Sequence, residues 1–300
     1  MRFVTAHTLD QALTALAQGA RPIAGGSDLV VAHRHGKAPL PDFVVAIDRV
    51  EALRRIDGGT DELTIGALTT HHDVETHPHI AERYSALADA SALVGSPSTR
   101  NVGTLGGNVM NASPAMDTGA PLLVFGAHIE LTSAVDGARR VPVCDLWTGP
   151  GRTVARPDEL CTAIHLPHPV SFSGSAYVRL EYRRAMEIAV VGAAANLAIA
   201  QNGTLAGLAV ALTAVAPTIV AVTGLESLLG NVVDEAMFAA IAELAAEQAS
   251  PISDLRASDR YRRHCVGIMA RRAAEAAARR ARGDIIAVPV NRSLGIGAAS

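Results

Sequence analysis

Apolar and polar residues follow short regular patterns over the first 66 residues, and the spacing predicts a mixture of strands and helices. Apolar side chains recur at helical spacing between Leu9 and Ala17, whereas residues 62–66 alternate as a half-buried strand does. The elements predicted in this part are strands at 2–4, 22–24, 43–47 and 62–66 and helices at 9–17 and 29–34. The strand at 22–24 leads directly into a glycine-rich loop.

In the middle of the chain, glycine and proline mark where the predicted helices and strands end. Residues 80–94 suit a helix that ends at the Gly-Ser-Pro run 95–97, because glycine and proline both terminate helices. Two strand-like stretches, 127–132 and 139–143, flank an Asp-Gly turn and predict a β-hairpin. The Pro-His-Pro run 167–169 then breaks the pattern, and we predict a domain boundary there.

Beyond this break, strands are expected first and helices later. The predicted elements are strands at 175–180, 189–200 and 208–215, helices from residue 233 onward and a long alanine- and arginine-rich helix at 261–282. Both halves therefore read as α+β, without the regular alternation of strand and helix that a doubly wound sheet shows. We predict one domain at 1–170, a second at 171–290 and a loose tail at 291–300.

Composition and charge narrow the class of protein. The 300 residues are 49% hydrophobic and 18% charged, which is typical of a globular protein. The formal charge of −3 gives no excess of basic residues of the kind that binds nucleic acid. We find neither a signal peptide nor a stretch that could form an integral membrane segment, and we expect a cytoplasmic protein. The three cysteines, Cys144, Cys161 and Cys265, are too few for an iron–sulfur cluster, which usually takes four.

Two glycine-rich loops are the candidate chemistry. Glycine lets backbone N–H groups approach an anion, and each loop follows an apolar segment, so the pair could cradle one pyrophosphate. The loops are Ala24–Asp28 and Thr104–Asn108. Neither fits the dinucleotide fingerprint of a Rossmann fold or a P-loop, and a single Gly-Gly pair is more often a tight turn.

Longer blocks around these loops resemble a known family. Residues 22–29 and 100–117 are similar to the two FAD loops of the medium, flavoprotein subunits of the carbon monoxide dehydrogenase and xanthine dehydrogenase family. Further similarity occurs, in the family's order, at 141–150, 183–189 and 254–262. The resemblance implies an N-terminal FAD-binding domain of the vanillyl-alcohol-oxidase (PCMH) type at 1–170 and a smaller flavoprotein C-terminal domain, a three-stranded sheet with helices, at 171–290.

The resemblance also implies which residues contact FAD. The two loops hold its pyrophosphate and flank the flavin, Asp117 matches an aspartate on the FAD, Arg179 stands where many relatives have a lysine near the flavin, and Cys161 stands where they have an aliphatic residue. The implied cofactor-binding residues are Ile23, Ala24, Gly25, Gly26, Ser27, Asp28, Leu29, Val30, Thr104, Leu105, Gly106, Gly107, Asn108, Asp117, Cys161 and Arg179. No residue is expected to act as nucleophile or general base.

The implied function is electron transfer within a divided complex. A large subunit would carry the molybdopterin cofactor, a small subunit would carry two [2Fe–2S] clusters, and this chain would pass electrons through FAD to an external acceptor, in a dimer of heterotrimers. One alternative is a stand-alone FAD-dependent oxidoreductase of the same superfamily. A second is a binding or assembly protein that kept the fold and lost FAD. In this interpretation another subunit selects the substrate, and the final acceptor is NAD, a quinone, a cytochrome or oxygen.

Three features have simpler interpretations. His71, His72, His77 and His79 suggest a metal site, but Pro78 interrupts any regular helical face, so we interpret the run as an exposed polar connection and predict no metal site. Asp117 could be the N-cap of a helix starting near Thr118. Cys161 could be a small buried hydrophobe.

Overall fold

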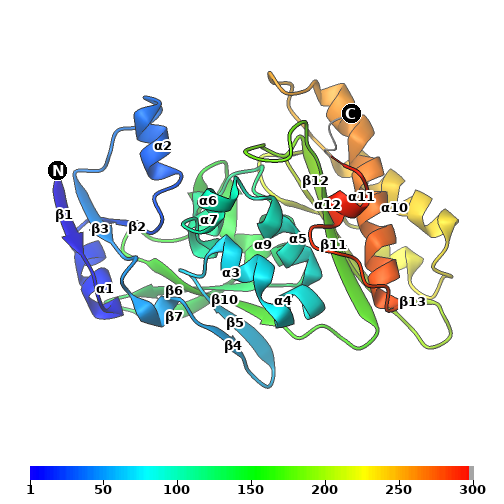
Figure 1. Cartoon of the computed structure of the whole chain (residues 1–300), viewed down its shortest axis with the longest axis horizontal. Coiled ribbons are helices and arrows are strands. Elements are labelled where there is room, and N and C mark those ends of the chain that lie inside the picture. The colour runs from blue at the N-terminus through cyan, green and yellow to red at the C-terminus, as the bar shows by residue number, and fades with distance from the viewer. Residues whose placement is uncertain (297–300) are drawn as a thin grey trace. The chain divides into compact units, whose positions relative to one another are not determined.

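The computed structural model describes residues 1–296, which form two compact units (Figure 1). Each unit is built from three separate stretches of the sequence. The first unit comprises residues 1–71, 97–112 and 126–168, and the second comprises 72–96, 113–125 and the chain from 169 onward. Each unit combines helices with β-sheet, so the predicted α+β class is confirmed.

The first unit contains a parallel and an antiparallel sheet. The parallel sheet has the order β1-β3-β2, and its strands are β1 (Arg2–Thr5), β2 (Arg21–Ile23) and β3 (Phe43–Ala46). The antiparallel sheet has the order β4-β5-β10-β6-β7, and its strands are β4 (Ile56–Gly58), β5 (Glu62–Gly66), β6 (His128–Ser133), β7 (Gly137–Pro142) and β10 (Leu160–Pro167). A small ribbon pairs β8 (Trp147–Gly149) with β9 (Arg152–Thr153).

Short helices connect these strands. They are α1 (Leu9–Ala17), α2 (Leu29–Arg34), the 3₁₀ turn η1 (Glu51–Leu53), α6 (Pro97–Arg100), α7 (Leu105–Asn111) and α9 (Val143–Leu146). Helix α1 is capped by the Thr8 side chain, which accepts a hydrogen bond from the Gln11 amide. The buried side of α1, with Leu13 and Leu16, packs against β3.

The central strand of the antiparallel sheet, β10, was not among the predicted elements. Its polar positions Thr162 and His165 are buried, because they bond to side chains of the neighbouring strands: Thr162 to Glu130 and His165 to Thr64. A bulge between Cys161 and Ala163 also disturbs the strand's alternation. The apolar–polar pattern therefore gave no signal for this strand.

The second unit is built on one antiparallel sheet with the order β11-β12-β13-β14. Its strands are β11 (Ser173–Leu180), β12 (Val191–Ile199), β13 (Leu205–Thr213) and the two-residue β14 (Val220–Ala221). Its helices are α4 (Pro78–Arg83), α5 (Ser85–Leu93), α8 (Gly119–Val124), the 3₁₀ turn η2 (Leu225–Leu228), α10 (Glu235–Gln248), α11 (Asp259–Ala281) and α12 (Val290–Ser293). Helix α3 (His71–Thr76) begins at the last residue of the first unit.

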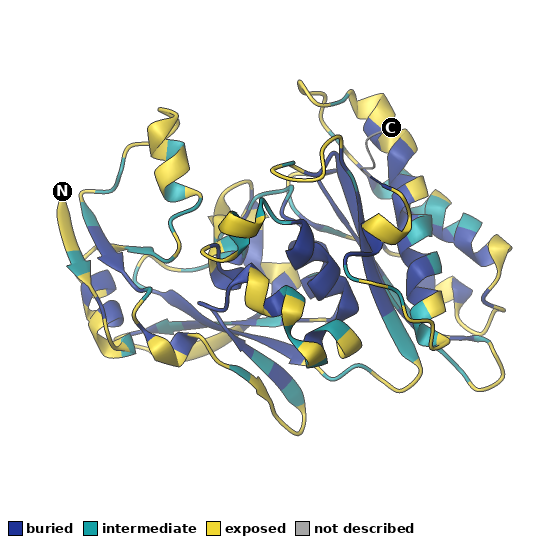
Figure 2. Ribbon diagram, viewed as in Figure 1, coloured by how far each residue is buried: buried dark blue, intermediate teal, exposed yellow. Residues whose placement is uncertain are grey.

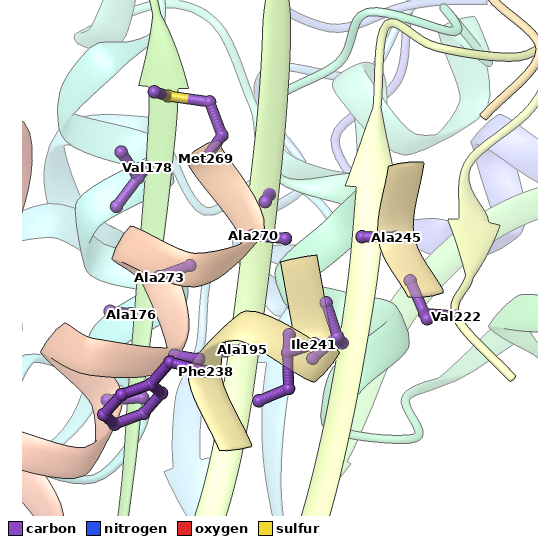
Figure 3. Packing of buried hydrophobic residues seen from close by; sticks show 14 of the residues in the cluster. Ala176, Val178, Ala195, Val222, Phe238, Ile241, Ala245, Met269, Ala270 and Ala273 are labelled. Atoms are coloured by element: carbon purple, nitrogen blue, oxygen red, sulfur yellow. The ribbon is translucent and has the colours of Figure 1, made fainter. Parts of the chain in front are cut away.

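Small residues bring the long helix α11 close to the sheet. Figure 3 shows Ala270 and Ala273 of α11 near Ala176 and Val178 of β11, with Ile241 of α10 in the same core. A Cβ on Gly174 would overlap the α11 backbone at Ala277 and Ala281, so the helix and strand touch through their main chains. Helices α5 and α8 lie against the opposite face, and the three long strands are largely buried (Figure 2).

The outer edge of β11 is closed by buried polar side chains rather than by another strand. Asp89 of α5 accepts hydrogen bonds from the amide of Tyr177 at 3.2 Å and from Arg280 at 2.6 Å, and Arg280 also donates to the carbonyl oxygen of Ser175. Two residues further on, the Asn291 side chain bonds both backbone groups of Arg179. Four outward backbone groups of residues 175, 177 and 179 are thus bonded by side chains, which blocks this part of the edge from pairing with another strand.

Asn291 also corrects the predicted tail. We expected a loose segment from residue 291, but Val290 and Asn291 are fully buried and the Val290 amide donates to Asp89. The tail composition gave no hint of these partners, which lie on α5 and β11. Residues 297–300 of the predicted tail lie outside the described residues.

The helix predicted at 80–94 is interrupted. It consists of α4 and α5, which are separated at Tyr84, where φ is −125° and ψ is 42°. Tyr84 is buried, and its ring packs edge-on against Phe125 at 5.2 Å between ring centroids. This contact orients Tyr84 toward the core at the break, which the local sequence could not show.

The histidine-rich run, predicted as an exposed polar connection, lies mostly in helices α3 and α4; His72 is exposed, but His71 is buried. His71 opens α3 and is 2% exposed, and its amide donates to the carbonyl oxygen of Gly103 at 3.1 Å. Burial, with Arg100 adding to the effect, lowers the pKa of His71 to about 4. Pro78 occupies the first turn of α4 and so starts a helix there. Within residues 1–296 no group of three or more His, Cys, Asp or Glu side chains is placed to hold a metal ion.

Across the described part of the chain, none of the helices has the length and apolarity needed to cross a bilayer.

The buried His71 leads to a prediction about pH. In the unfolded chain His71 takes up a proton near pH 6.5, whereas in the folded protein it stays neutral down to about pH 4. The free energy of unfolding therefore falls as pH is lowered through this window, by about 3 kcal/mol at pH 4 relative to pH 7. Denaturant unfolding of the wild type and of His71→Gln, measured between pH 4 and 7, should show the variant lacking this part of the pH dependence. Parallel pH curves for the two proteins would contradict the assignment.

Candidate functional site

The first glycine loop, residues 23–30, joins the end of β2 to the start of α2. A Cβ on Gly25 would overlap the carbonyl oxygen of Val102, so the loop lies in direct main-chain contact with the segment that leads into the second loop. Gly26 has a φ of +68°, in the left-handed region that favours glycine. The side chains of Ile23 and Val30 lie 3.2 and 3.3 Å from where a Gly26 Cβ would be, so they pack around the turn.

The backbone N–H groups of this loop are available. None of the described residues accepts a hydrogen bond from the amides of residues 24–29, and the Asp28 side chain makes no capping bond to α2. Residues 24–29 are exposed or half-buried, so water or a ligand can reach these six amides. The first loop can therefore offer several donors to one anion.

The second loop, residues 104–108, uses its amides differently. Thr104 is the N-cap of α7, and its hydroxyl accepts from Gly107 at 3.1 Å. The amides of Leu105, Gly106 and Asn108 donate to the carbonyl oxygens of Thr69, Ala67 and Thr104. The four amides of residues 105–108 are thus already satisfied within the first unit, and the loop is held rigidly in place.

Close packing and an indole bond fix this second loop. A Cβ on Gly106 would lie 2.6 Å from the Cβ of Ala67, so only glycine allows α7 to begin this close to the end of β5. The Trp147 indole donates to the carbonyl oxygen of Val109 at 3.0 Å and holds the body of α7. The second loop is therefore held in place by its own unit, and the first loop contacts the segment that leads into it, at Val102.

His71 and Ser27 border the place where the two loop regions meet. A Cβ on Gly103 would lie 3.4 Å from the His71 ring and 3.6 Å from the Ser27 hydroxyl oxygen. Nδ1 of His71 is buried and has no hydrogen-bond partner among the described residues. Because His71 is neutral at ordinary pH, it adds no positive charge at this meeting point.

Asp117 and Arg179 form a second cluster, within the second unit. Arg179 of β11 is fully buried, and its Nη1 donates to Oδ2 of Asp117 at 2.7 Å. Its Nε donates to Glu181 at 2.7 Å, and the Tyr177 hydroxyl donates to the other oxygen of Asp117 at 2.7 Å. The structure thus brings together two predicted residues with two that the sequence analysis did not select.

Asp117 is therefore not a helix cap. Helix α8 begins at Gly119 with Thr118 as N-cap, and both Asp117 carboxylate oxygens are bonded to β11 instead. Burial raises the pKa of Asp117, and Arg179 and Tyr177 oppose that shift. Burial and the nearby Asp117 carboxylate raise the pKa of Tyr177 well above its usual value, so its hydroxyl stays a donor.

Cys161 lies on β10 opposite Leu131 in the first unit and is buried. Burial, with a smaller contribution from the Glu130 charge, raises the pKa of its thiol to about 12. The thiol is therefore protonated at neutral pH and is a poor nucleophile. This agrees with its interpretation as a small buried hydrophobe.

The sequence analysis missed several residues that shape these two clusters. Tyr177 of β11 and Glu181, directly after the strand, lie two residues on either side of Arg179, so the alternation of side chains could have indicated them once β11 was recognised. Gly103, His71 and Asn291 gave no comparable signal, because their partners lie far away in the sequence.

Two family descriptions match the chain. The FAD binding domain in molybdopterin dehydrogenase matches residues 1–169, and the CO dehydrogenase flavoprotein C-terminal domain matches residues 176–277. Together they cover both of the sequence regions in which the loops and the Asp117–Arg179 cluster lie.

Individual relatives agree with these matches along nearly the whole chain. The carbon monoxide dehydrogenase medium chain of Afipia carboxidovorans is 35% identical over 272 residues, covering 90% of this chain and 93% of the relative. The xanthine dehydrogenase FAD-binding subunit of Escherichia coli O157:H7 is 31% identical, covering 89% and 92%. A structure of reconstituted CO dehydrogenase from Oligotropha carboxidovorans superposes with a TM-score of 0.88 at 30% identity, covering 93% of this chain and 98% of the other. The chain therefore belongs to the FAD-binding subunits of molybdenum hydroxylases of the carbon monoxide dehydrogenase and xanthine dehydrogenase type, and it is part of an oxidoreductase.

Proposed function

We propose that this chain holds FAD between the iron–sulfur clusters of a small subunit and an external electron acceptor, in a complex whose large subunit carries the molybdenum cofactor. The observation that carries the proposal is the first loop, with six unbonded amides at a main-chain contact that only glycine permits. The relatives named as carbon monoxide and xanthine dehydrogenase subunits support the division of labour.

The first loop fits a pyrophosphate. Within residues 1–296 no acceptor is bonded to the amides of residues 24–29, and N–H groups close together in a glycine-rich loop can bind phosphate oxygens. We propose that residues 23–30 donate to the pyrophosphate, and that residues 104–108 supply the rigid surface on which the cofactor rests. Asp117, Cys161 and Arg179 complete the proposed FAD-binding set, and residues 1–170 and 171–290 are the proposed FAD-binding and C-terminal domains.

FAD, once bound, supplies the ability to exchange electrons singly or in pairs. The chain's own residues bind and orient it, and none is proposed to act as a nucleophile or general base. Because the chain has only three cysteines, all free, [2Fe–2S] clusters would have to be carried by a partner. We propose a dimer of heterotrimers that works in the cytoplasm, where free thiols persist.

Purification tests this function directly. The native protein should be yellow, release FAD on denaturation, and elute with two further subunits, iron and molybdenum. A colourless protein that cannot be reconstituted with FAD would contradict the proposal. A yellow protein that elutes alone, without iron or molybdenum, would support a stand-alone flavin oxidoreductase instead.

Gly25→Ala tests the role of the first loop. The added methyl group overlaps the Val102 carbonyl oxygen, which is main chain, so the loop must move away from residue 102. We expect the dissociation constant for FAD to rise at least tenfold, equivalent to about 1.4 kcal/mol. Fluorescence titration of the FAD-free protein would measure it.

Gly58→Ala is the matched control. A Cβ at Gly58 would have no heavy atom within 4 Å, and this glycine lies in β4 of the same unit. We expect its FAD affinity to equal that of the wild type. Equal affinities for Gly25→Ala and Gly58→Ala would rule out a close fit of the first loop to the cofactor.

A further inference from the structure

Two surface segments of the second unit lie side by side and carry exposed apolar side chains. One is 182–188, between β11 and β12, and the other is 252–263, which leads into α11; together they form the paired-segment surface. The Tyr182 hydroxyl connects them, because it donates to the carbonyl oxygen of Arg256 at 2.9 Å. Both segments are largely exposed (Figure 2). Their exposed apolar side chains are Tyr182, Met186, Ile188, Ile252, Leu255 and Tyr261.

A buried arginine holds the two segments in place. Arg262 is 4% exposed, and its Nη1 donates to the carbonyl oxygen of Val190, two residues beyond the first segment, at 2.8 Å. Its Nη2 donates to Oδ1 of Asp254 in the second segment at 2.7 Å. The same Asp254 oxygen accepts from the Arg256 amide at 2.8 Å, which fixes the turn around Leu255. The surface is therefore preorganised in the free chain.

Leu255 stands at the tip of this turn and is fully exposed. Its side chain adds nothing to the core of the second unit, so its apolar area leaves water only when another molecule covers it. Single exposed apolar side chains are common, but six of them on two adjacent, fixed segments make a patch of the kind that marks an interaction site. Tyrosine, methionine and arginine, which all occur in the patch, are enriched in protein–protein interfaces.

The paired-segment surface is positively charged, unlike the chain as a whole. It contains six arginines and three carboxylates, so its formal charge is +3, whereas that of the whole chain is −3. The three carboxylates are already bonded within the surface: Glu187 to Arg183, Asp254 to Arg262 and Asp259 to Ser253. An acidic partner would therefore complement its charge.

We propose that the paired-segment surface docks another protein subunit of the complex, whose contacting face has an apolar hollow for Leu255 and an acidic rim for the arginines. This inference rests on the proposed function, which supplies the partner subunits. The mixture of apolar side chains with arginines favours a protein partner, because a surface for nucleic acid is a basic patch or stripe without an apolar centre.

The test measures the dissociation constant between this chain and the other subunits of the purified complex, by size-exclusion chromatography with light scattering over a series of dilutions. Leu255→Asp places a negative charge at the centre of the surface, so the constant should rise at least tenfold. Because Leu255 is fully exposed, this variant should keep the melting temperature of the wild type. Arg260→Glu reverses one charge of the surface and should also raise the constant, more strongly at low salt than at high salt.

Ile285→Asp is the matched control. Ile285 is likewise a fully exposed apolar residue of the second unit, but it follows the C-terminal end of α11, whereas the paired-segment surface lies at the N-terminal end. The 23 residues of α11 separate the two places by about 35 Å, at a rise of about 1.5 Å per residue. The dissociation constant of this variant should equal that of the wild type.

The outcomes separate this inference from the function on which it rests. Weaker assembly of Leu255→Asp and Arg260→Glu, with none for Ile285→Asp, would support it. If the wild type assembles and both variants assemble equally tightly, the docking role is overturned while the proposed function stands. Binding of the intact complex to phosphatidylserine vesicles, lost in Arg260→Glu without a change in assembly, would assign the surface to a membrane and also overturn the proposal. If the wild type purifies without other subunits, the proposed function itself fails, and the docking proposal with it.

Discussion

A single buried carboxylate, Asp89, organises the second unit. It accepts hydrogen bonds from Arg280 of α11, from the amide of Tyr177 in β11 and from the amide of Val290 at the start of α12. Burial raises the pKa of Asp89, and the guanidinium of Arg280 opposes that shift. Removing one partner of such a buried pair typically costs about 3–5 kcal/mol, because the remaining charge has no compensation. Two helices, a strand edge and the C-terminal segment therefore depend on one side chain.

The same strand edge links the fold to the candidate site. Along β11, residues 176 and 178 face the core under α11, while residues 175, 177 and 179 carry the polar contacts of the other side. Arg280 bonds the outward carbonyl oxygen of Ser175, Asp89 bonds the amide of Tyr177, and Asn291 bonds both backbone groups of Arg179. The bonds from Asn291 thus hold the backbone at Arg179, whose side chain is fully buried.

In the first unit, the corresponding constraint is close main-chain packing. Gly25 against Val102 and Gly106 against Ala67 bring three segments together that are far apart in sequence. The two glycine loops then contribute differently: the first has unbonded amides, and the second has its amides committed to its own support. Rigid support on one side and available donors on the other suit the binding of an anionic group.

The sequence by itself determined the regular elements whose patterns are local, and a family resemblance that the comparisons confirm. Helix α1 and strand β5 lie where their apolar spacing placed them, because each buries one side, and helix α2 lies at its predicted residues although none of its side chains is buried. Strand β10 and the break at Tyr84 were decided only in the tertiary structure, since the partners of Thr162, His165 and Tyr84 come from other parts of the chain. The tertiary structure likewise turned the predicted tail into a support for Arg179 and buried His71 beside Gly103. Burial and hydrogen bonding between residues far apart in the sequence produce no regular spacing of apolar and polar residues. They could therefore be learned only from the folded chain.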